Sequence, residues 1–256
     1  MTDERVLGGT TVLIAREPDR AEGLRTRLER CGATVLVAPA TITEPGDGDA
    51  LEAAVTSLDG FDWIVVASVN AVRALLDAAR RADVFLARAA VRWAAVGPAT
   101  TAALEAAGLR VDLSPDGPET ATGLVAAFGP VTPGRVLLPQ GDLAGPGLAD
   151  GLRAHGFDVH EVLAYRTVPV AFPPAVLDAW SAGRIEAVVL AAPSGARQVA
   201  AQLRPHPGVA GVAIGEPTAA AARAAGLRVD AIAAHATSDA LVDALVAALS
   251  SPRRSR

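Results

Sequence analysis

The sequence predicts an α/β protein made of two doubly wound parallel sheets, and two patterns lead to this class. Short β-branched runs alternate with Ala- and Leu-rich stretches along the chain, as is typical of βα units that bury a parallel sheet. In addition, the segment Ala106–Asp112 recurs letter for letter as Ala224–Asp230. Because a chain of 256 residues suits one or two domains, the repeat predicts two similar domains.

The repeat extends beyond this heptapeptide and includes strands as well as helix starts. The matching segments are Val12–Ile14 with Val136–Leu138, Trp63–Ala67 with Ala187–Ala191, and Val96–Thr100 with Ile214–Thr218. Their separation is far longer than the roughly 20 to 50 residues of a solenoid repeat. Each copy is therefore expected to be a whole domain.

Apolar runs of strand length predict the sheets. In chain order these runs are Val12–Ala15, Val35–Ala38, Ile64–Ala67, Trp93–Val96, Val136–Leu138, Val159–Leu163, Val188–Ala191, Val212–Ile214 and Val229–Ala233. Helices are expected in most of the gaps. The stretch Thr101–Gly108 reads as a helix closed by a C-terminal glycine, and Thr218–Gly226 repeats it. Each half is therefore predicted to be a flavodoxin-like layer structure.

The composition argues against several classes of protein. A net charge of −5 gives no support to a nucleic-acid surface. Although 51% of the residues are hydrophobic, no apolar run approaches the roughly 20 residues of a membrane helix. The start Met1–Arg5 lacks the basic and apolar regions of a signal peptide. A cytoplasmic protein that binds neither nucleic acid nor membrane is expected, and we expect a monomer.

Metal, nucleotide and hydrolase chemistry lack their sequence signatures. The histidines have no ligand-like spacing; they are His155, His160, His206 and His235. No glycine-rich nucleotide fingerprint follows a strand, and the chain contains no lysine that could serve a phosphate-binding loop. Ser194 lies in Pro-Ser-Gly without the Gly-x-Ser-x-Gly pattern of a nucleophile elbow. These patterns therefore give no support to a metal site, a nucleotide site or a hydrolase triad.

Four strand-to-helix corners instead carry small, polar or glycine residues. They are Ala67–Asn70, Val96–Thr100, Ala191–Gly195 and Ile214–Thr218. In open α/β sheets, ligands bind beyond the carboxyl ends of the strands. A helix start there offers unpaired N–H groups and a partial positive charge, so it binds a carboxylate or phosphate without a basic side chain. Paired corners in two halves predict a ligand with several acidic groups.

A second interpretation of the same corners stays open at this point. The hydroxyl side chains of Ser68, Thr100, Ser194 and Thr218 could serve only to cap the helices that follow. In that case the corners would stabilise the fold and carry no function.

Taken together, the corners and several strands resemble those of the uroporphyrinogen-III synthase family. The resemblance spans nearly the whole chain and rests on Val12–Arg16, Asp62–Val72, Val96–Thr100, Glu161–Thr167, Pro193–Gly195 and Ile214–Thr218. Each motif is weak alone, and their order and spacing make the resemblance specific. One departure is Ala192, which stands where the family usually has a serine before Pro-Ser-Gly.

The resemblance implies an exchange of the chain ends between the two domains. One domain is expected to join residues 1–38 to residues 170–256, and the other to contain residues 44–163. Residues 39–43 and 164–169 would then be linkers that form a hinge of two segments. Proline and glycine residues are frequent in and beside both linkers, as expected where regular secondary structure is interrupted.

The resemblance also implies a reaction that needs no cofactor. The family's substrate is hydroxymethylbilane, a linear tetrapyrrole with eight carboxylates, which loses water and closes through a spiro intermediate with its last ring inverted. Tyr165, the only tyrosine in the chain, is the expected catalytic acid. The expected substrate-binding residues are Arg16, Ser68, Asn70, Gly97, Thr100, Pro193, Ser194, Gly195, Gly215 and Thr218.

Alternatives to these roles remain open from the sequence. Tyr165 could brace the site without donating a proton. The arginines Arg16, Arg166 and Arg197 are expected to help the corners to attract the carboxylates, but they could instead be solvated surface residues. A bilobal ligand sensor would share the same architecture. A catalytically degenerate homologue is the other alternative, and Ala192 supports it.

Overall fold

A computed structural model describes residues 6–250, and the chain divides into two compact units. The first unit joins Met1–Ile42 to Val168–Arg256, and the second consists of Thr43–Thr167. Each unit has its own sheet and its own hydrophobic cores.

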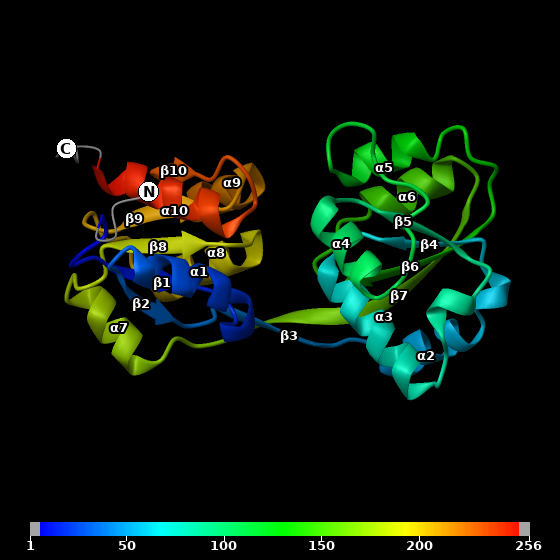
Figure 1. Cartoon of the computed structure of the whole chain (residues 1–256), viewed down its shortest axis with the longest axis horizontal. Helices are drawn as coiled ribbons and strands as arrows, with labels where there is room; N and C mark the ends of the chain where they lie inside the picture. The colour runs from blue at the N-terminus through cyan, green and yellow to red at the C-terminus, as the bar shows by residue number, and fades with distance from the viewer. Residues whose placement is uncertain (1–5, 251–256) are drawn as a thin grey trace. The chain divides into compact units, whose positions relative to one another are not determined.

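The first unit is a parallel sheet with the strand order β10-β9-β8-β1-β2. Its strands are β1 (Thr11–Ile14), β2 (Thr34–Val37), β8 (Ala187–Leu190), β9 (Ala210–Ala213) and β10 (Ala231–Ile232). Its helices are α1 (Pro18–Arg30), α7 (Pro174–Ser181), α8 (Pro193–Gln202), α9 (Glu216–Ala224) and α10 (Ser238–Ser250). Helices α1 and α10 pack in one core, and α7, α8 and α9 pack in the other, so both faces of the sheet are covered (Figure 1).

The buried parallel strands explain why their sequences read as continuous apolar runs. All residues of β8 are buried because helices cover both faces of the sheet. The surrounding helices are apolar on one side only. In α1, proline stands in the first turn, and the buried residues Ala21, Leu24 and Leu28 recur at the spacing of one helical face.

The second unit has the strand order β3-β7-β6-β4-β5, and β7, β6, β4 and β5 are paired in parallel. Its strands are β3 (Thr41–Pro45), β4 (Trp63–Val66), β5 (Arg92–Ala95), β6 (Arg135–Gly141) and β7 (Asp158–Pro169). Its helices are α2 (Gly48–Thr56), α3 (Val69–Arg81), α4 (Pro98–Ala106), α5 (Ala121–Ala127) and α6 (Gly147–Ala154), with 3₁₀ turns at Leu58–Gly60 and Leu86–Arg88. Helices α2, α3 and α4 share one core, and α5 and α6 share the core of the opposite face (Figure 1).

The repeated heptapeptide has the same structural role in both units. It closes α4 at Gly108 and α9 at Gly226, which have φ of 74° and 84°. This left-handed conformation favours glycine because an L side chain is strained there. The leucine that follows each glycine is buried, and each heptapeptide ends in an aspartate beside the neighbouring strand.

These two aspartates tie the returning chain to the start of a strand. Asp112 accepts a hydrogen bond from the Trp93 N–H at 3.0 Å, and Asp230 accepts one from the Gly211 N–H at 2.9 Å. In return, the N–H of Asp112 donates to the Trp93 carbonyl and that of Asp230 to the Gly211 carbonyl, both at 2.8 Å. The duplicated sequence therefore forms a duplicated clamp at β5 and β9.

A second pair of carboxylates clamps the central strands in the same manner. Glu186 accepts from the Thr11 N–H at 2.6 Å, and Asp62 accepts from the Arg135 N–H at 2.8 Å. Because these residues precede β8 and β4 and contact the starts of β1 and β6, β8 corresponds to β4 and β1 corresponds to β6.

The strands expected from the sequence are all present, whereas β3 was not expected. Strand β3 includes residues 41–43 of the expected linker 39–43, and β7 includes all of the expected linker 164–169. The division between the units falls within these two strands. An edge strand tolerates the proline that the sequence interpretation took as chain punctuation. Residues 1–38 carry β1, which pairs with β8 of the first sheet.

The Asp230 clamp predicts a measurable contribution to stability. We expect Asp230→Ala to lower the free energy of unfolding by about 1 to 3 kcal/mol, because it leaves the Gly211 N–H without its acceptor. Asp112→Ala should act in the same direction but more weakly, since the Asp112 side chain is 28% exposed against 12% for Asp230. Urea denaturation would measure both, with the exposed Asp243→Ala as control. A change no larger than that of the control would contradict the clamp.

Candidate functional site

The carboxyl edge of the second sheet collects the expected site residues of that unit. Strands β7, β6, β4 and β5 are neighbours and run parallel, so the chain leaves all of them at the same edge. Tyr165 lies on β7, Ser68 and Asn70 follow β4, and Gly97 and Thr100 follow β5. Ligands of open α/β sheets bind at such an edge.

Ser68 and Tyr165 form a hydrogen-bonded pair at this edge. Ser68 caps α3, where its hydroxyl accepts from the Ala71 N–H at 3.2 Å and donates to the Tyr165 hydroxyl oxygen at 3.1 Å. A serine hydroxyl has one proton to donate. When Ser68 is the donor in this contact, the phenolic proton of Tyr165 can be given to another acceptor.

The tyrosine reaches Ser68 across the intervening strand β6. Tyr165 is paired with Gly141, the last residue of β6, and β6 lies between β7 and β4. A Cβ atom on Gly141 would lie 2.5 Å from Cζ of the tyrosine and 2.8 Å from its hydroxyl oxygen. The phenol therefore lies directly against the glycine backbone. Sequence reasoning missed Gly141, whose only signal is a glycine at the end of a strand.

Asn70 lies in the first turn of α3 and is held from the side of β3. Its Nδ2 donates to Oγ1 of Thr43 at 3.3 Å, and both side chains are half-buried. This contact fixes the amide beside the corner after β4.

The corner after β5 has room for a ligand atom close to the backbone. Gly97 precedes α4 with φ −150° and ψ 166°, and no side chain caps this helix. These angles suit any residue, so the conformation does not require glycine. A Cβ there would meet only Glu119, at 3.9 Å. Thr100, in the first turn, is a buried polar residue that is 5% exposed.

The first unit repeats this corner after β9. Gly215 precedes α9 with φ −177° and ψ 171°, again without a side-chain cap. Its Cβ position would meet only Cδ of Pro217, at 3.9 Å. Thr218 occupies the position of Thr100 and is 3% exposed.

The remaining corner, after β8, brings together Arg16 and the Pro-Ser-Gly segment. Ala192 precedes α8 with φ −159° and ψ 151°, and Pro193 is the first residue of the helix. The Cβ position of Gly195 lies 3.6 Å from the carbonyl oxygen of Ala15. Arg16, which follows Ala15, therefore lies beside the first turn of α8, and both Arg16 and Ser194 are half-buried.

The capping interpretation applies to only one of the expected hydroxyl residues. Ser68 does cap its helix, whereas Thr100, Ser194 and Thr218 lie inside the first turns of helices that have no side-chain cap. The first N–H groups of α4, α8 and α9 therefore lack the acceptor that a capping side chain would provide. Together with the helix dipole, they favour an anionic ligand.

Charged side chains are unevenly distributed around these corners. Arg166 and Arg197 are exposed. Glu216, in the first turn of α9, pairs with Arg223 at 3.1 Å, which partly neutralises the carboxylate at that corner. Both partners are at least half exposed, so this pair is expected to contribute little to stability.

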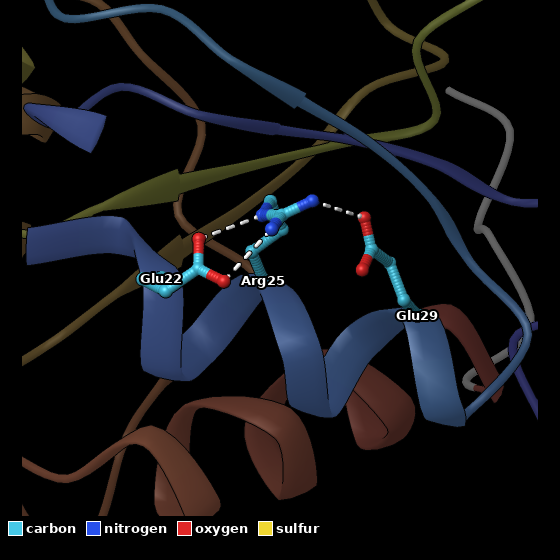
Figure 2. Close-up of polar contacts among 3 residues, drawn as sticks. All are labelled: Glu22, Arg25 and Glu29. Carbon is cyan, nitrogen blue, oxygen red and sulfur yellow. Dashed lines mark hydrogen bonds and ion pairs between the residues drawn. The ribbon is translucent and has the colours of Figure 1, made fainter. Parts of the chain in front are cut away.

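A charged triplet lies on the exposed side of α1. Arg25 bridges Glu22 and Glu29 at 2.8 and 3.1 Å (Figure 2). The hydrogen bonds from Arg25 lower the pKa of the Glu22 carboxyl, and the hydrogen bonds to Glu22 raise the pKa of Arg25. Because the groups are exposed, they describe a solvated helix surface.

The described residues do not provide a metal site or a membrane helix. Within residues 6–250, no group of three or more His, Cys, Asp or Glu side chains is placed to hold a metal ion. In the same range, no helix is long and apolar enough to cross a membrane.

The fold and its corners define a duplicated, doubly wound α/β protein in which three helix starts at the carboxyl edges of the sheets have no side-chain cap. The family model "Uroporphyrinogen-III synthase HemD" matches residues 22–243. This chain belongs to the uroporphyrinogen-III synthase family.

Individual relatives agree with this family. A uroporphyrinogen-III synthase of Synechococcus elongatus is 31% identical over 168 residues, which is 64% of this chain and 63% of that relative, less than two thirds of its length. A crystal structure of a mutant uroporphyrinogen III synthase from the extremely thermophilic bacterium Thermus thermophilus has a TM-score of 0.68 at 21% identity, covering 95% of this chain and 100% of that one. A uroporphyrinogen-III synthetase structure from Helicobacter pylori has a TM-score of 0.63 at 14% identity, covering 93% and 99%. These structures share the fold.

The missing cap of α8 predicts that stability can be gained at Ala192. Its backbone angles nearly equal those of Ser68, so a serine there should cap α8 as Ser68 caps α3. We expect Ala192→Ser to raise the free energy of unfolding by about 0.5 to 2 kcal/mol. Ala201→Ser, on an exposed position late in α8, is the control and should give no gain. Equal effects of the two substitutions in urea denaturation would refute the cap.

Proposed function

We propose that this protein cyclises and dehydrates hydroxymethylbilane to uroporphyrinogen III, the isomer with an inverted last ring. The observation that carries the proposal is the Ser68–Tyr165 pair, in which serine donates to the tyrosine oxygen and leaves the phenolic proton available. Family membership supports the same reaction.

The carboxylates of the substrate are proposed to bind at helix starts. Helices α4, α8 and α9 have no side-chain cap, and each has a proline, which lacks an N–H, at one of its first two positions. The proposed donors to carboxylate oxygens are therefore the N–H groups of Ala99, Ser194 and Glu216. The net charge of −5 opposes a polyanion at long range. Screening over about 8 Å at physiological salt leaves the local N–H groups and Arg16 to decide binding.

The proposed chemistry begins with loss of the terminal hydroxyl. Tyr165 donates its phenolic proton to that oxygen, the carbon–oxygen bond breaks with its electron pair going to oxygen, and water leaves. The carbon that carried the hydroxyl then bonds to the substituted carbon of the last ring, and this bond gives the spiro intermediate. Reopening and closure at the other side of that ring complete the inversion, and the ring proton that is lost at closure returns to the phenolate. No metal or organic cofactor enters this balance.

Positioning is proposed to supply most of the specificity. Hydroxymethylbilane closes by itself to the uninverted isomer I. The enzyme must therefore hold the linear tetrapyrrole in a conformation that favours the spiro route over direct closure. The acid then only speeds departure of the hydroxyl. Because a phenol is a weak acid, we expect its contribution to lie at the low end for general-acid catalysis.

A ligand-binding homologue without turnover is the second candidate function. Ala192 favours it, because α8 has no side-chain cap where the family usually provides a hydroxyl. The decisive experiment supplies freshly made hydroxymethylbilane and separates the oxidised products by isomer. Isomer III supports the synthase, and isomer I at the spontaneous rate would establish the alternative.

The cellular setting is also a proposal. We place the protein in the cytoplasm as a monomer, which cell fractionation and light scattering would test.

A side chain at Gly215 should block substrate binding without disturbing the fold. Its Cβ position meets only Cδ of Pro217, at 3.9 Å, so a Cβ atom fits at this helix start without a clash. If a carboxylate approaches this backbone, Gly215→Val removes charge-assisted hydrogen bonds worth about 1.5 to 3 kcal/mol, which corresponds to roughly a 10- to 100-fold loss in kcat/KM. Gly145→Val, in an exposed loop, is the control. Thr218→Ala should cost only about 0.5 to 2 kcal/mol, and equal modest losses at both positions would argue against backbone binding.

Tyr165→Phe tests the acid role directly. The substitution keeps the ring and its packing but deletes the proton donor, so we expect about a 100-fold slower formation of isomer III. Whatever is converted should remain isomer III, because inversion depends on how the substrate is held. Ser68→Ala keeps the phenol and should be less harmful. Unchanged turnover of Tyr165→Phe would leave only a bracing role, and enzyme-bound formation of isomer I would assign conformational control to Tyr165.

A further inference from the structure

The pairing of β6 with β7 contains an irregularity next to Tyr165. The register runs regularly to Gln140 opposite Leu163, but the next pair is Gly141 opposite Tyr165. Ala164 is therefore an extra residue in β7, which defines a β-bulge. Bulges re-aim side chains and are frequent beside active sites.

The bulge changes the face on which the tyrosine lies. In a regular strand, successive side chains point to opposite faces, so Tyr165 would lie opposite Val162 and Ala164. Instead, all three residues pack in the same hydrophobic core, which α2, α3 and α4 share. The extra residue has thus turned the phenol toward the face that carries α3 and Ser68.

The segment after β3 holds the bulge in place. The carbonyl of Ala164 accepts from the Gly46 N–H at 3.1 Å, and that of Leu163 accepts from the Asp47 N–H at 2.6 Å. A Cβ on Gly46 would lie 2.1 Å from the Leu163 carbonyl oxygen, too close for any side chain. The close approach that satisfies both bulge carbonyls therefore requires glycine at position 46.

The orientation of Tyr165 also requires free space beside β6, and Gly141 provides this space. It is not among the described glycines with a left-handed φ, so its backbone does not call for glycine. The requirement comes from the phenol, since a Cβ there would lie 2.5 Å from Cζ of Tyr165. The far end of a tyrosine can swing aside, so a methyl group at this position should displace the hydroxyl rather than unfold the sheet.

We infer that Gly141 and Gly46 are positioning residues that direct the hydroxyl of Tyr165 to Ser68, Gly141 by leaving room for the ring and Gly46 by holding the bulge that turns it. The inference rests on the proposed function only where it predicts activity. The geometry can be tested separately, because Tyr165 is the single tyrosine of the chain.

Tyrosine labelled with carbon-13 at Cζ gives one resonance, which reports the surroundings of the Tyr165 hydroxyl. In Gly141→Ala we expect this resonance to move in the same direction as in Ser68→Ala, and isomer III formation to fall roughly 10-fold or more, toward the effect of losing the acid. Gly145→Ala, in the loop just after β6, is the matched control because no heavy atom lies within 4 Å of its Cβ position. Its resonance and activity should equal those of the parent protein.

A second pair of variants tests the bulge. Gly46→Ala should move the Tyr165 resonance in the same direction as Gly141→Ala. Gly48→Ala should leave it in place, since its Cβ position meets only Nη2 of Arg81, at 3.8 Å.

A double variant that lacks the tyrosine ring, which would meet the new methyl group, is the control for folding. If Gly141→Ala does not fold, the double variant Gly141→Ala/Tyr165→Ala should fold as well as Tyr165→Ala alone, as judged by thermal unfolding. A double variant that also fails would place the requirement for glycine in the backbone and overturn the inference.

The outcomes separate the positioning role from the proposed function. An unmoved Cζ resonance in folded Gly141→Ala would overturn the positioning role whatever the activity. A moved resonance with an unchanged rate of isomer III formation would support the positioning role and remove the acid role from Tyr165. A moved resonance together with slower formation of isomer III supports both.

Discussion

Parallel pairing of buried strands is the constraint on which the rest of this structure depends. It places the carboxyl ends of β7, β6, β4 and β5 at one edge of the second sheet, and those of β2, β1, β8 and β9 at one edge of the first. Helix starts therefore gather there whatever the side chains are. The clamps at Asp112 and Asp230 act at the opposite ends of the strands, where they hold β5 and β9 in place.

The duplicated units differ at one matching corner, where one unit has a hydroxyl side chain and the other has none. In the second unit, Ser68 caps α3 and contacts Tyr165, so one hydroxyl joins the helix to the candidate acid. In the first unit, Ala192 occupies the matching position and α8 remains uncapped. Uncapped N–H groups suit an anion, whereas a capped start suits a fixed side-chain network.

Periodicity and repetition were sufficient to predict the class of fold and the strands that lead into the candidate site. Buried parallel strands are apolar at every position, so they can be recognised from the sequence alone. The edge strand β3 was not, because Pro45 and the glycine after it look the same in a turn and at a sheet edge. The capping roles were also undecided, since a hydroxyl at a corner can lie at the cap, as Ser68 does, or inside the first turn, as Thr100 does.

The sequence by itself determined the duplicated α/β architecture, the corners with their glycines, and Tyr165 as the one candidate phenol. Only the tertiary structure decided which way that phenol points. Its direction depends on an extra residue in the pairing of β6 with β7, on the carbonyls that Gly46 and its neighbour satisfy, and on the bare backbone of Gly141. These partners are far apart in the chain, and each is ordinary when taken alone. Their effect arises from packing distances that exist only once the sheet has formed.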